Sequence, residues 1–377
     1  MLPAKVERAA IIVSFLGVLL VPGLGLAVGV DSANVSEAEM RELATFPEWS
    51  WTVAGAAAWP ARFRTFFEDR FAFRRRLLTW RTDFLWHRLG SPPSSTVIPG
   101  KDGWLFYAID GGIEDYAQTD PATDSELEVW RQMIDRTDRW LAARGIKYLF
   151  VIAPDKPMIY PEFAPDSLVR LRDDFQMDQL IAYMRSRSSV DILDLRPALL
   201  AAKSSELLYH RYDTHWNDRG ALVAARQIAK RVRDWFPSVP VLDREGFEEV
   251  RGVPSGDSTS MLGLVDAGKL AMPGLVPRSG WRHRVLEPLT PSPYSEDGRV
   301  VTDIPGSDLP RLLMFRDSFG SRLIPYLSED FSHAVYLWRN DFDPSEVGQA
   351  RPDVVIQEFV ARHLVTHVPY PQGIPEP

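Results

Sequence analysis

The chain has 377 residues, of which 45% are hydrophobic and 25% are charged, as is ordinary for a folded globular protein. Its formal net charge of -8 argues against a nucleic-acid-binding protein, which would carry a strong basic excess. The absence of cysteine excludes disulfides, zinc–thiolate sites and cysteine nucleophiles. The length allows one large domain, or one domain with a sizeable insertion.

The N-terminus predicts a membrane-targeting segment. Lys5 and Arg8 precede an uncharged run, 9–30, whose 22 residues are enough to cross the hydrocarbon core as a helix. Basic residues before such a helix predict a cytoplasmic N-terminus and an exported remainder, anchored to the inner membrane. The small residues at 27–29 also fit a signal-peptide cleavage site, and a buried core helix is a third interpretation. Both export interpretations place the protein in the periplasm or otherwise outside the cytoplasm.

The next segment is expected to be irregular at first and then helical. Residues 31–60 show no clear periodicity, whereas apolar residues recur every three or four positions from about 61 to 89. Ser91-Pro92-Pro93 ends this amphipathic helix. The sequence thus predicts a signal anchor or signal peptide at 1–30, a juxtamembrane segment with its helix at 31–90, and a catalytic domain at 91–370.

Helical and strand patterns alternate through the predicted domain. A hairpin at 97–107 is followed by helices and strands at 124–144, 147–152, 166–187, 190–195, 217–236, 311–316, 319–328, 334–338 and 353–357. Residues 237–310 are rich in Pro, Gly and Ser, and we interpret them as an insertion with short strands that covers or rims the site. The alternation predicts a three-layer α/β/α domain with a parallel sheet. Sites in such sheets lie at the carboxyl ends of the strands, where Asp155 and Lys156 would then lie.

A carboxylate and an imidazole stand two positions apart in a polar loop before the helix at 217. Asp213 can fix the tautomer of His215 and stabilise the imidazolium, which makes the histidine a general base at neutral pH. The alternative is a polar pair that only stabilises a turn. Two metal ligands are a further interpretation, although we find no other His, Asp or Glu cluster in the sequence that completes a set. Trp216 next to them either forms a platform for a sugar or packs in the core.

The candidate nucleophile is Ser318. It follows the apolar run 311–316 and precedes a probable helix, so its hydroxyl would project from a strand-to-helix turn at the sheet edge. The backbone N–H groups of the turn could stabilise an oxyanion. The alternative is a serine that only caps the helix.

Several separated motifs together resemble the alginate O-acetyltransferase family of the AlgJ/AlgX type, within the SGNH hydrolase group. The resemblance covers about 60–365, with Asp213-x-His215-Trp216 before the serine, an order permuted relative to ordinary SGNH esterases. Its motifs are Glu68–Arg74, Gly100–Tyr107, Pro154-Asp155-Lys156 with Ile159–Glu162, Asp213–Trp216, Asp317-Ser318 and Gln357–Arg362. The sequence departs from the usual pattern at Arg316, where typical SGNH esterases have the glycine of Gly-Asp-Ser. The family's oxyanion-hole asparagine is unassigned, and nothing in 237–310 matches.

The resemblance implies an exported polysaccharide O-acetyltransferase with a Ser318–His215–Asp213 triad and an acetyl-serine intermediate. Ser318's own N–H is the first oxyanion donor, and Arg322, Tyr326, Trp216 and Lys156 are further candidates for binding the oxyanion or substrate. It implies an exopolysaccharide acceptor such as alginate, a membrane-bound O-acyltransferase that supplies acetyl groups, and neither a metal nor an organic cofactor. The alternatives are an SGNH acetyl esterase and a non-catalytic glycan-binding component of an export complex.

Overall fold

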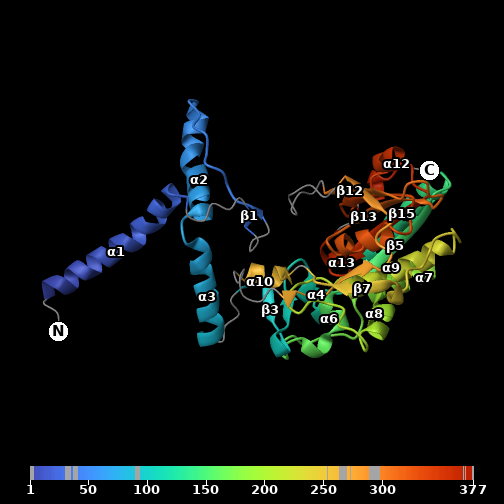
Figure 1. Cartoon of the computed structure of the whole chain (residues 1–377), viewed down its shortest axis with the longest axis horizontal. Helices are drawn as coiled ribbons and strands as arrows, with labels where there is room; N and C mark the ends of the chain where they lie inside the picture. The colour runs from blue at the N-terminus through green and yellow to red at the C-terminus, as the bar shows by residue number, and fades with distance from the viewer. Residues whose placement is uncertain are drawn as a thin grey trace. The chain divides into compact units, whose positions relative to one another are not determined.

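The computed structural model describes most of the chain (Figure 1). The described residues are 4–29, 35–36, 41–89, 94–252, 254–262, 270–271, 273–287, 298–367, 369 and 371–375. The chain divides into two compact units, one formed by Met1–Ser94 with Thr259–Ala267 and the other by Ser95–Ser258 with Gly268–Pro377.

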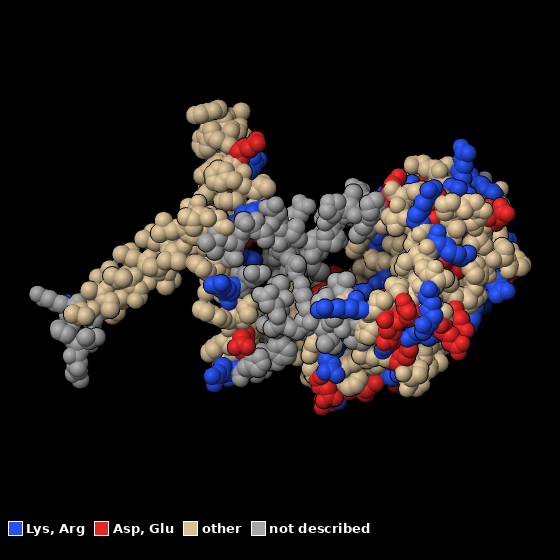
Figure 2. Space-filling view, viewed as in Figure 1, with Lys and Arg blue, Asp and Glu red and all other residues tan. Residues whose placement is uncertain are grey.

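The first unit contains an apolar N-terminal helix, α1 (Ala4–Ala27). Its segment Arg8–Ala27 has a mean hydropathy of 2.4 and shows no charged side chain beyond Arg8 (Figure 2). Among the described residues it is the one helix that is long and apolar enough to cross a membrane. Length and composition thus agree with the predicted anchor, and a signal sequence would have the same properties.

The rest of the first unit corrects the single helix predicted from 61 to 89. The structure has two helices, α2 (Val53–Arg70) and α3 (Arg74–Leu89), with short strands β1 (Val35–Ser36) and β2 (Arg41–Glu42) before them. Helix α2 begins earlier than predicted because the Thr52 side chain caps it, accepting from the Gly55 N–H. The helical path is broken at Phe73, whose φ of 68° is left-handed and incompatible with a continuous α-helix.

A seven-stranded sheet organises the second unit. The strand order is β11 (Arg284–Glu287), β12 (Arg299–Asp303), β14 (His333–Trp338), β13 (Arg311–Arg316), β15 (Val354–Val360), β5 (Lys147–Ala153) and β6 (Ile192–Asp194). The five strands from β14 to β6 are parallel, as predicted. The sheet is mixed at one side, because β12 is antiparallel to β14 and β11 to β12.

These two antiparallel strands come from the segment that we expected to be an insertion. All four residues of β11 are exposed, as is typical of an edge strand, and an edge strand lacks the apolar run by which buried strands are found in a sequence. The remaining short elements of 237–310 are β7 (Phe247–Val250), β8 (Pro254–Ser255), α10 (Asp257–Met261), β9 (Leu270–Ala271) and β10 (Gly274–Pro277). Of these, β7 pairs with β10 and β8 with β9, outside the main sheet.

Some of the helices of this unit contact strands of the sheet directly, and others pack on those helices or on one another (Figure 1). They are α4 (Gly112–Ala117), α5 (Asp124–Ala142), α6 (Lys156–Ile159), α7 (Gln176–Arg187), α8 (Arg196–Ala202), α9 (Asp218–Arg233), α11 (Ile324–Leu327), α12 (Pro344–Ala350) and α13 (His363–Thr366). The predicted helices at 124 and 217 are confirmed, as is the hairpin of β3 (Val97–Pro99) and β4 (Leu105–Tyr107).

The helix predicted from 166 was wrong at its start. Helix α7 begins at Gln176, because Asp178 accepts from the Phe175 N–H at its first turn. The preceding residues instead follow an irregular path on which the Leu171 N–H donates to Ala117 of α4.

Three neighbouring strands, β13, β15 and β5, bring the polar motifs to one edge of the sheet. Their residues are almost entirely buried, and their carboxyl ends lie side by side because the strands are parallel. The segments that follow them are 317–318, 361–363 and 154–156. The candidate site is therefore built at the edge where open α/β sheets place their ligands.

Two helix caps give a test of this architecture. The Asn217 side chain accepts from the Arg219 and Gly220 N–H groups at the start of α9 and donates to the Leu207 carbonyl at 2.6 Å. Thr123 caps α5 in a capping box with Glu126, and this cap involves only residues of the first turn of the helix. We expect Thr123→Ala to lower the free energy of unfolding by about 1 kcal/mol. We expect Asn217→Ala to lower it further, since the Leu207 carbonyl also loses its donor. Urea denaturation measures both, and equal losses would contradict the role assigned to the Asn217 amide.

Candidate active site

Ser318 lies in the turn that follows β13, before the short 3-10 helix η4 (Phe319–Arg322). Asp317 fixes this turn with both carboxylate oxygens, accepting from the Phe319 N–H at 2.8 Å and from the Val360 N–H at 2.7 Å. Ser318 itself is half-buried, so its hydroxyl remains within reach of a substrate. The strand-to-helix turn predicted from the sequence is present.

Arg316 stabilises the turn from beneath. It is fully buried, and one guanidinium nitrogen donates to the Asp317 carbonyl at 3.0 Å and to the Ser321 hydroxyl at 2.8 Å. A Cβ at Gly320 would lie 2.7 Å from Cβ of Arg316 and 2.9 Å from a carboxyl oxygen of Glu358. Position 320 therefore requires glycine. The arginine that departs from the Gly-Asp-Ser pattern thus has a packing role under the turn.

His215 reaches Ser318 from a loop that closes between Tyr209 and Trp216, which form an isolated β-bridge. Its Nε2 is 2.8 Å from the Ser318 Oγ, and its Nδ1 is 2.7 Å from the Asp213 Oδ1. With Nδ1–H donating to the carboxylate, Nε2 is left to accept the serine proton. The structure therefore brings together the three residues that the sequence predicted as a triad.

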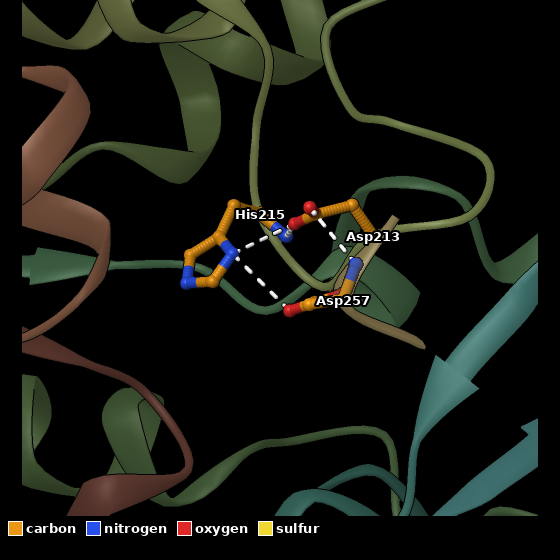
Figure 3. A group of neighbouring side chains, drawn as sticks. All are labelled: Asp213, His215 and Asp257. Carbon is orange, nitrogen blue, oxygen red and sulfur yellow. Dashed lines mark hydrogen bonds and ion pairs between the residues drawn. The ribbon is translucent and has the colours of Figure 1, made fainter. Parts of the chain in front are cut away.

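A second carboxylate, Asp257, lies on the same side of the imidazole (Figure 3). Its Oδ2 is 3.4 Å from the His215 Nδ1, and its backbone N–H donates to the Asp213 Oδ2 at 3.3 Å. The Thr214 N–H donates to Asp257 at 2.7 Å and the Thr214 hydroxyl donates to it as well. The sequence analysis missed Asp257, because it lies in the aperiodic segment 237–310 and no local motif marks it.

The environment of His215 favours its charged form. Burial of the imidazole opposes the charge, but the hydrogen bonds and charges of Asp213 and Asp257 outweigh burial and raise the pKa of His215 to about 9. At neutral pH the resting imidazole is therefore mostly protonated, and the neutral ring that can accept the serine proton becomes more abundant as the pH rises toward 9. Once the ring has taken up that proton, the imidazolium is strongly stabilised. This is the electrostatic contribution expected of a carboxylate behind a general base.

Asp213, His215 and Asp257 are also the kind of group that could bind a metal ion, since their ligand atoms lie within 4.8 Å of one another. The sequence analysis found only two of these three. Protein donors already point at the carboxylate oxygens: His215 Nδ1 and the Asp257 N–H at Asp213, and Thr214 at Asp257. The arrangement thus suits an oriented imidazole better than a vacant set of ligands.

Lys156 lies beneath the loop that carries the histidine. It is buried, and its ammonium donates to three backbone carbonyls, those of Asp213 at 2.7 Å, His210 at 3.2 Å and Arg211 at 3.4 Å. Burial lowers the pKa of Lys156 to about 8, against the charges of Asp257 and Asp213. Its protons are directed at the loop, so it positions the loop and is not placed to bind substrate as expected.

The other predicted binding residues occupy different places. Trp216 is fully buried, and its indole N–H donates to the Phe319 carbonyl at 3.2 Å, so a sugar platform was wrong and the packing interpretation holds. Tyr326 is also buried, against Phe247 and Trp281, and is not exposed to a substrate. Arg322 lines a cavity and donates to Asp218 at 3.1 Å.

The backbone N–H of Ser318 remains the best oxyanion donor. The next N–H groups are engaged, since that of Phe319 donates to Asp317 and that of Ser321 to the Ser318 carbonyl. Within the described part of the chain, the Ser318 N–H donates to no acceptor. It is therefore available to an oxygen that becomes negatively charged at the serine.

The two carboxylates on His215 make a measurable prediction. We expect Asp257→Asn to lower the pKa of His215 from about 9 toward the ordinary value of 6.5, because one of two stabilising negative charges is removed. An NMR titration of the imidazole measures this change. Asp308→Asn removes an exposed carboxylate elsewhere in the same unit and serves as the control. An unchanged His215 pKa in Asp257→Asn would contradict the electrostatic role of Asp257.

Comparisons with known proteins agree with this architecture. Residues 97–288, which are 192 of the 377, match the profile of a family described as "SGNH hydrolase-like domain, acetyltransferase AlgX". A solved structure of a DHHW family protein from Eubacterium siraeum is similar, with a TM-score of 0.52 and 12% identity over 74% of this chain and 97% of that one. The likeness of that structure bears on the fold alone.

Two relatives in sequence carry the name "Probable alginate O-acetylase AlgJ". The protein from Pseudomonas aeruginosa is 29% identical over 45% of this chain, and that from Pseudomonas syringae pv. tomato is 25% identical over 68%. These alignments span 41% and 61% of the relatives, respectively. The predicted SGNH-like fold class is thus confirmed, apart from its antiparallel edge. The chain belongs to the family of SGNH hydrolase-like acetyltransferase domains of the AlgX type.

Proposed function

We propose that the protein is an exported polysaccharide O-acetyltransferase that works through an acetyl-Ser318 intermediate. The observation that supports this most strongly is the 2.8 Å separation between the Ser318 Oγ and the His215 Nε2, with Asp213 on the opposite ring nitrogen. A serine that only capped its helix would have no need of an oriented imidazole. The distance falls within the hydrogen-bond reach, about 2.6–3.2 Å, that a nucleophile and its base require.

In the first half-reaction, Ser318 takes the acetyl group from the donor. The Ser318 hydroxyl transfers its proton to the His215 Nε2 while its oxygen bonds to the acetyl carbonyl carbon. The Ser318 N–H stabilises the resulting oxyanion. The bond from the carbonyl carbon to the donor then breaks, and the imidazolium returns the proton to the leaving group. Acetyl-Ser318 and neutral His215 remain.

In the second half-reaction, a sugar hydroxyl takes the place of the donor. It gives its proton to His215 and attacks the acetyl carbon, and Ser318 leaves as it regains that proton. The product is a sugar O-acetyl ester and the free enzyme. All proton transfers use one nitrogen of one histidine, so holding this ring in place serves both half-reactions.

The surroundings of the reaction follow from the N-terminal helix. If α1 anchors the chain to the inner membrane, Ser318 acts in the periplasm, where there is no ready supply of acetyl-CoA. The donor would then be a membrane-bound O-acyltransferase that passes acetyl groups across the membrane. The name of the AlgJ relatives makes alginate the first acceptor to test. The proposed steps use side chains of this chain alone.

Substitutions in the triad test the mechanism in the full-length protein. With p-nitrophenyl acetate as donor, we expect Ser318→Ala to abolish the increase in mass by one acetyl group. We expect His215→Ala to slow acetyl-enzyme formation by at least about a hundredfold, as for loss of a general base. Ser318→Ala combined with His215→Ala should be no slower than the worse single variant, because triad members act as a unit. Ser204→Ala, an exposed serine, is the control.

Asp257 sharpens this test. Because it offers a second carboxylate to Nδ1, Asp213→Asn alone should cost less rate than His215→Ala, and Asp213→Asn with Asp257→Asn should cost more than either alone. Small, additive losses of the acetylation rate in all of these variants would refute the triad.

A separate measurement distinguishes the transferase from an acetyl esterase: the transferase passes the acetyl group to oligosaccharides, whereas the esterase passes it to water.

A further inference from the structure

A cavity of about 200 Å³ adjoins the candidate active site and has no part in the mechanism above. It lies between β10, the residues after β7, the start of α9 and η4. Its lining residues are His210, Asp218, Val250, Arg251, Gly252, Pro273, Gly274, Leu275, Val276 and Arg322. The His210 N–H donates to the His215 carbonyl at 3.2 Å, and Arg322 is four positions after Ser318. Both catalytic segments therefore contribute to its wall.

The imidazole of His210 is the unusual group in this cavity. Only 3% of His210 is exposed, yet neither ring nitrogen has a hydrogen-bond partner within the described residues. Buried polar atoms without partners are rare and destabilise the fold. Burial and the charge of Arg322 lower the pKa of His210 to about 3, so the ring is neutral and offers one donor and one acceptor. A pair of hydroxyl groups would satisfy both.

The charges of the cavity favour an anion. Asp218 is engaged on both oxygens, accepting from Arg322 at 3.1 Å and from the Leu275 N–H at 3.1 Å. Arg251 is exposed, and no carboxylate in the described part of the chain lies within ion-pair distance of it. A guanidinium that has no carboxylate of its own is well shaped to bind one from a ligand.

The remaining walls are apolar and are made by side chains of Val250, Pro273, Leu275 and Val276. A ligand with hydroxyl groups, a carboxylate and an apolar C–H face matches the three parts of the lining, which are the His210 imidazole, the Arg251 guanidinium and the apolar side chains. We propose that this cavity binds one hexuronate residue of the acceptor polysaccharide, with its carboxylate on Arg251 and ring hydroxyls on His210. The proposal rests on the proposed function, since a sugar held here would place a neighbouring residue of the same chain at Ser318.

Binding to the full-length protein tests this site. The probes are a trimer of mannuronate and the mannose trimer of the same linkage, whose affinities are measured by calorimetry. We expect tighter binding of the acidic trimer, and a weakening of about fivefold in Arg251→Gln, as for one partly exposed charged pair. Arg185→Gln, which removes an exposed arginine of α7 that has no ion pair among the described residues, should bind as the wild type does.

His210→Leu separates a binding role from a structural one. Because the imidazole has no protein partners, its replacement by an apolar side chain should raise the melting temperature while weakening binding of the acidic trimer by about fivefold. A lower melting temperature together with unchanged binding would overturn the proposal. So would equal binding of both trimers, or wild-type affinity in Arg251→Gln.

Failure of the proposed function gives a different result. Suppose that the wild type forms no acetyl-Ser318 but binds the acidic trimer, and that Arg251→Gln weakens this binding. The acetyl-serine mechanism is then refuted, and the cavity is supported as a glycan-binding site. If acetyl-Ser318 forms but Arg251→Gln binds the acidic trimer as the wild type does, the hexuronate site is refuted and the acetyl-serine mechanism is supported.

Discussion

The loop that carries the candidate base depends on one buried ammonium group. Removing Lys156 from water disfavours its charge, and the cost is offset only where its donors find acceptors. Three loop carbonyls supply them, and Asp213 and Asp257 add favourable charge. Since Lys156 begins α6 shortly after the end of β5, this interaction attaches a loop without regular structure to the edge of the buried sheet. Lys156 holds Asp213 by its backbone carbonyl, and His215 contacts the Asp213 carboxylate.

Ser318, the candidate nucleophile, is held by a second polar network at the same sheet edge. Arg316 and Glu358 lie buried on the neighbouring strands β13 and β15, and the Asp317 N–H donates to Glu358 at 3.3 Å. Burial and the nearby charge of Asp317 raise the pKa of Glu358 well above its ordinary value. Such a network is costly to bury and costly to break, which makes the position of Ser318 rigid. The serine and the histidine are thus held by different networks, and the bond from the Trp216 indole to the Phe319 carbonyl joins the two segments beside the functional atoms.

Much of the candidate site could be predicted because its signals are local. Asp213 and His215 are two positions apart, and Ser318 follows a buried strand, so each motif is visible in a short window of sequence. Asp257 could not be predicted, because only the tertiary fold brings α10 beside the imidazole. Trp216 was ambiguous for a related reason: sequence gives the residue type next to a site, and burial decides whether that residue faces a ligand or the core.

The same distinction applies to the fold. The parallel strands were found because burial on both faces makes them continuous apolar runs. The place of β11 and β12 in the main sheet was missed. Strand β11 is an exposed edge strand and lacks that pattern, and β12, although its central residues are buried, pairs with β14 and not with β13, the next strand in the chain. The start of α7 was misplaced because a contact with α4, distant in sequence, holds the preceding residues out of the helix.

The strand order has a consequence for biogenesis. Strand β13 lies between β14 and β15, both of which follow it in the chain, and the Asp317 carboxylate is held by the Val360 N–H. A nascent chain that has emerged only as far as Ser318 therefore contains the serine, but it lacks the β15 backbone that holds the turn around it. The turn reaches its final shape only when β15, which follows it in the chain, joins the sheet. The oriented pair of Ser318 and His215 is thus complete only after the late strand β15 has joined the sheet.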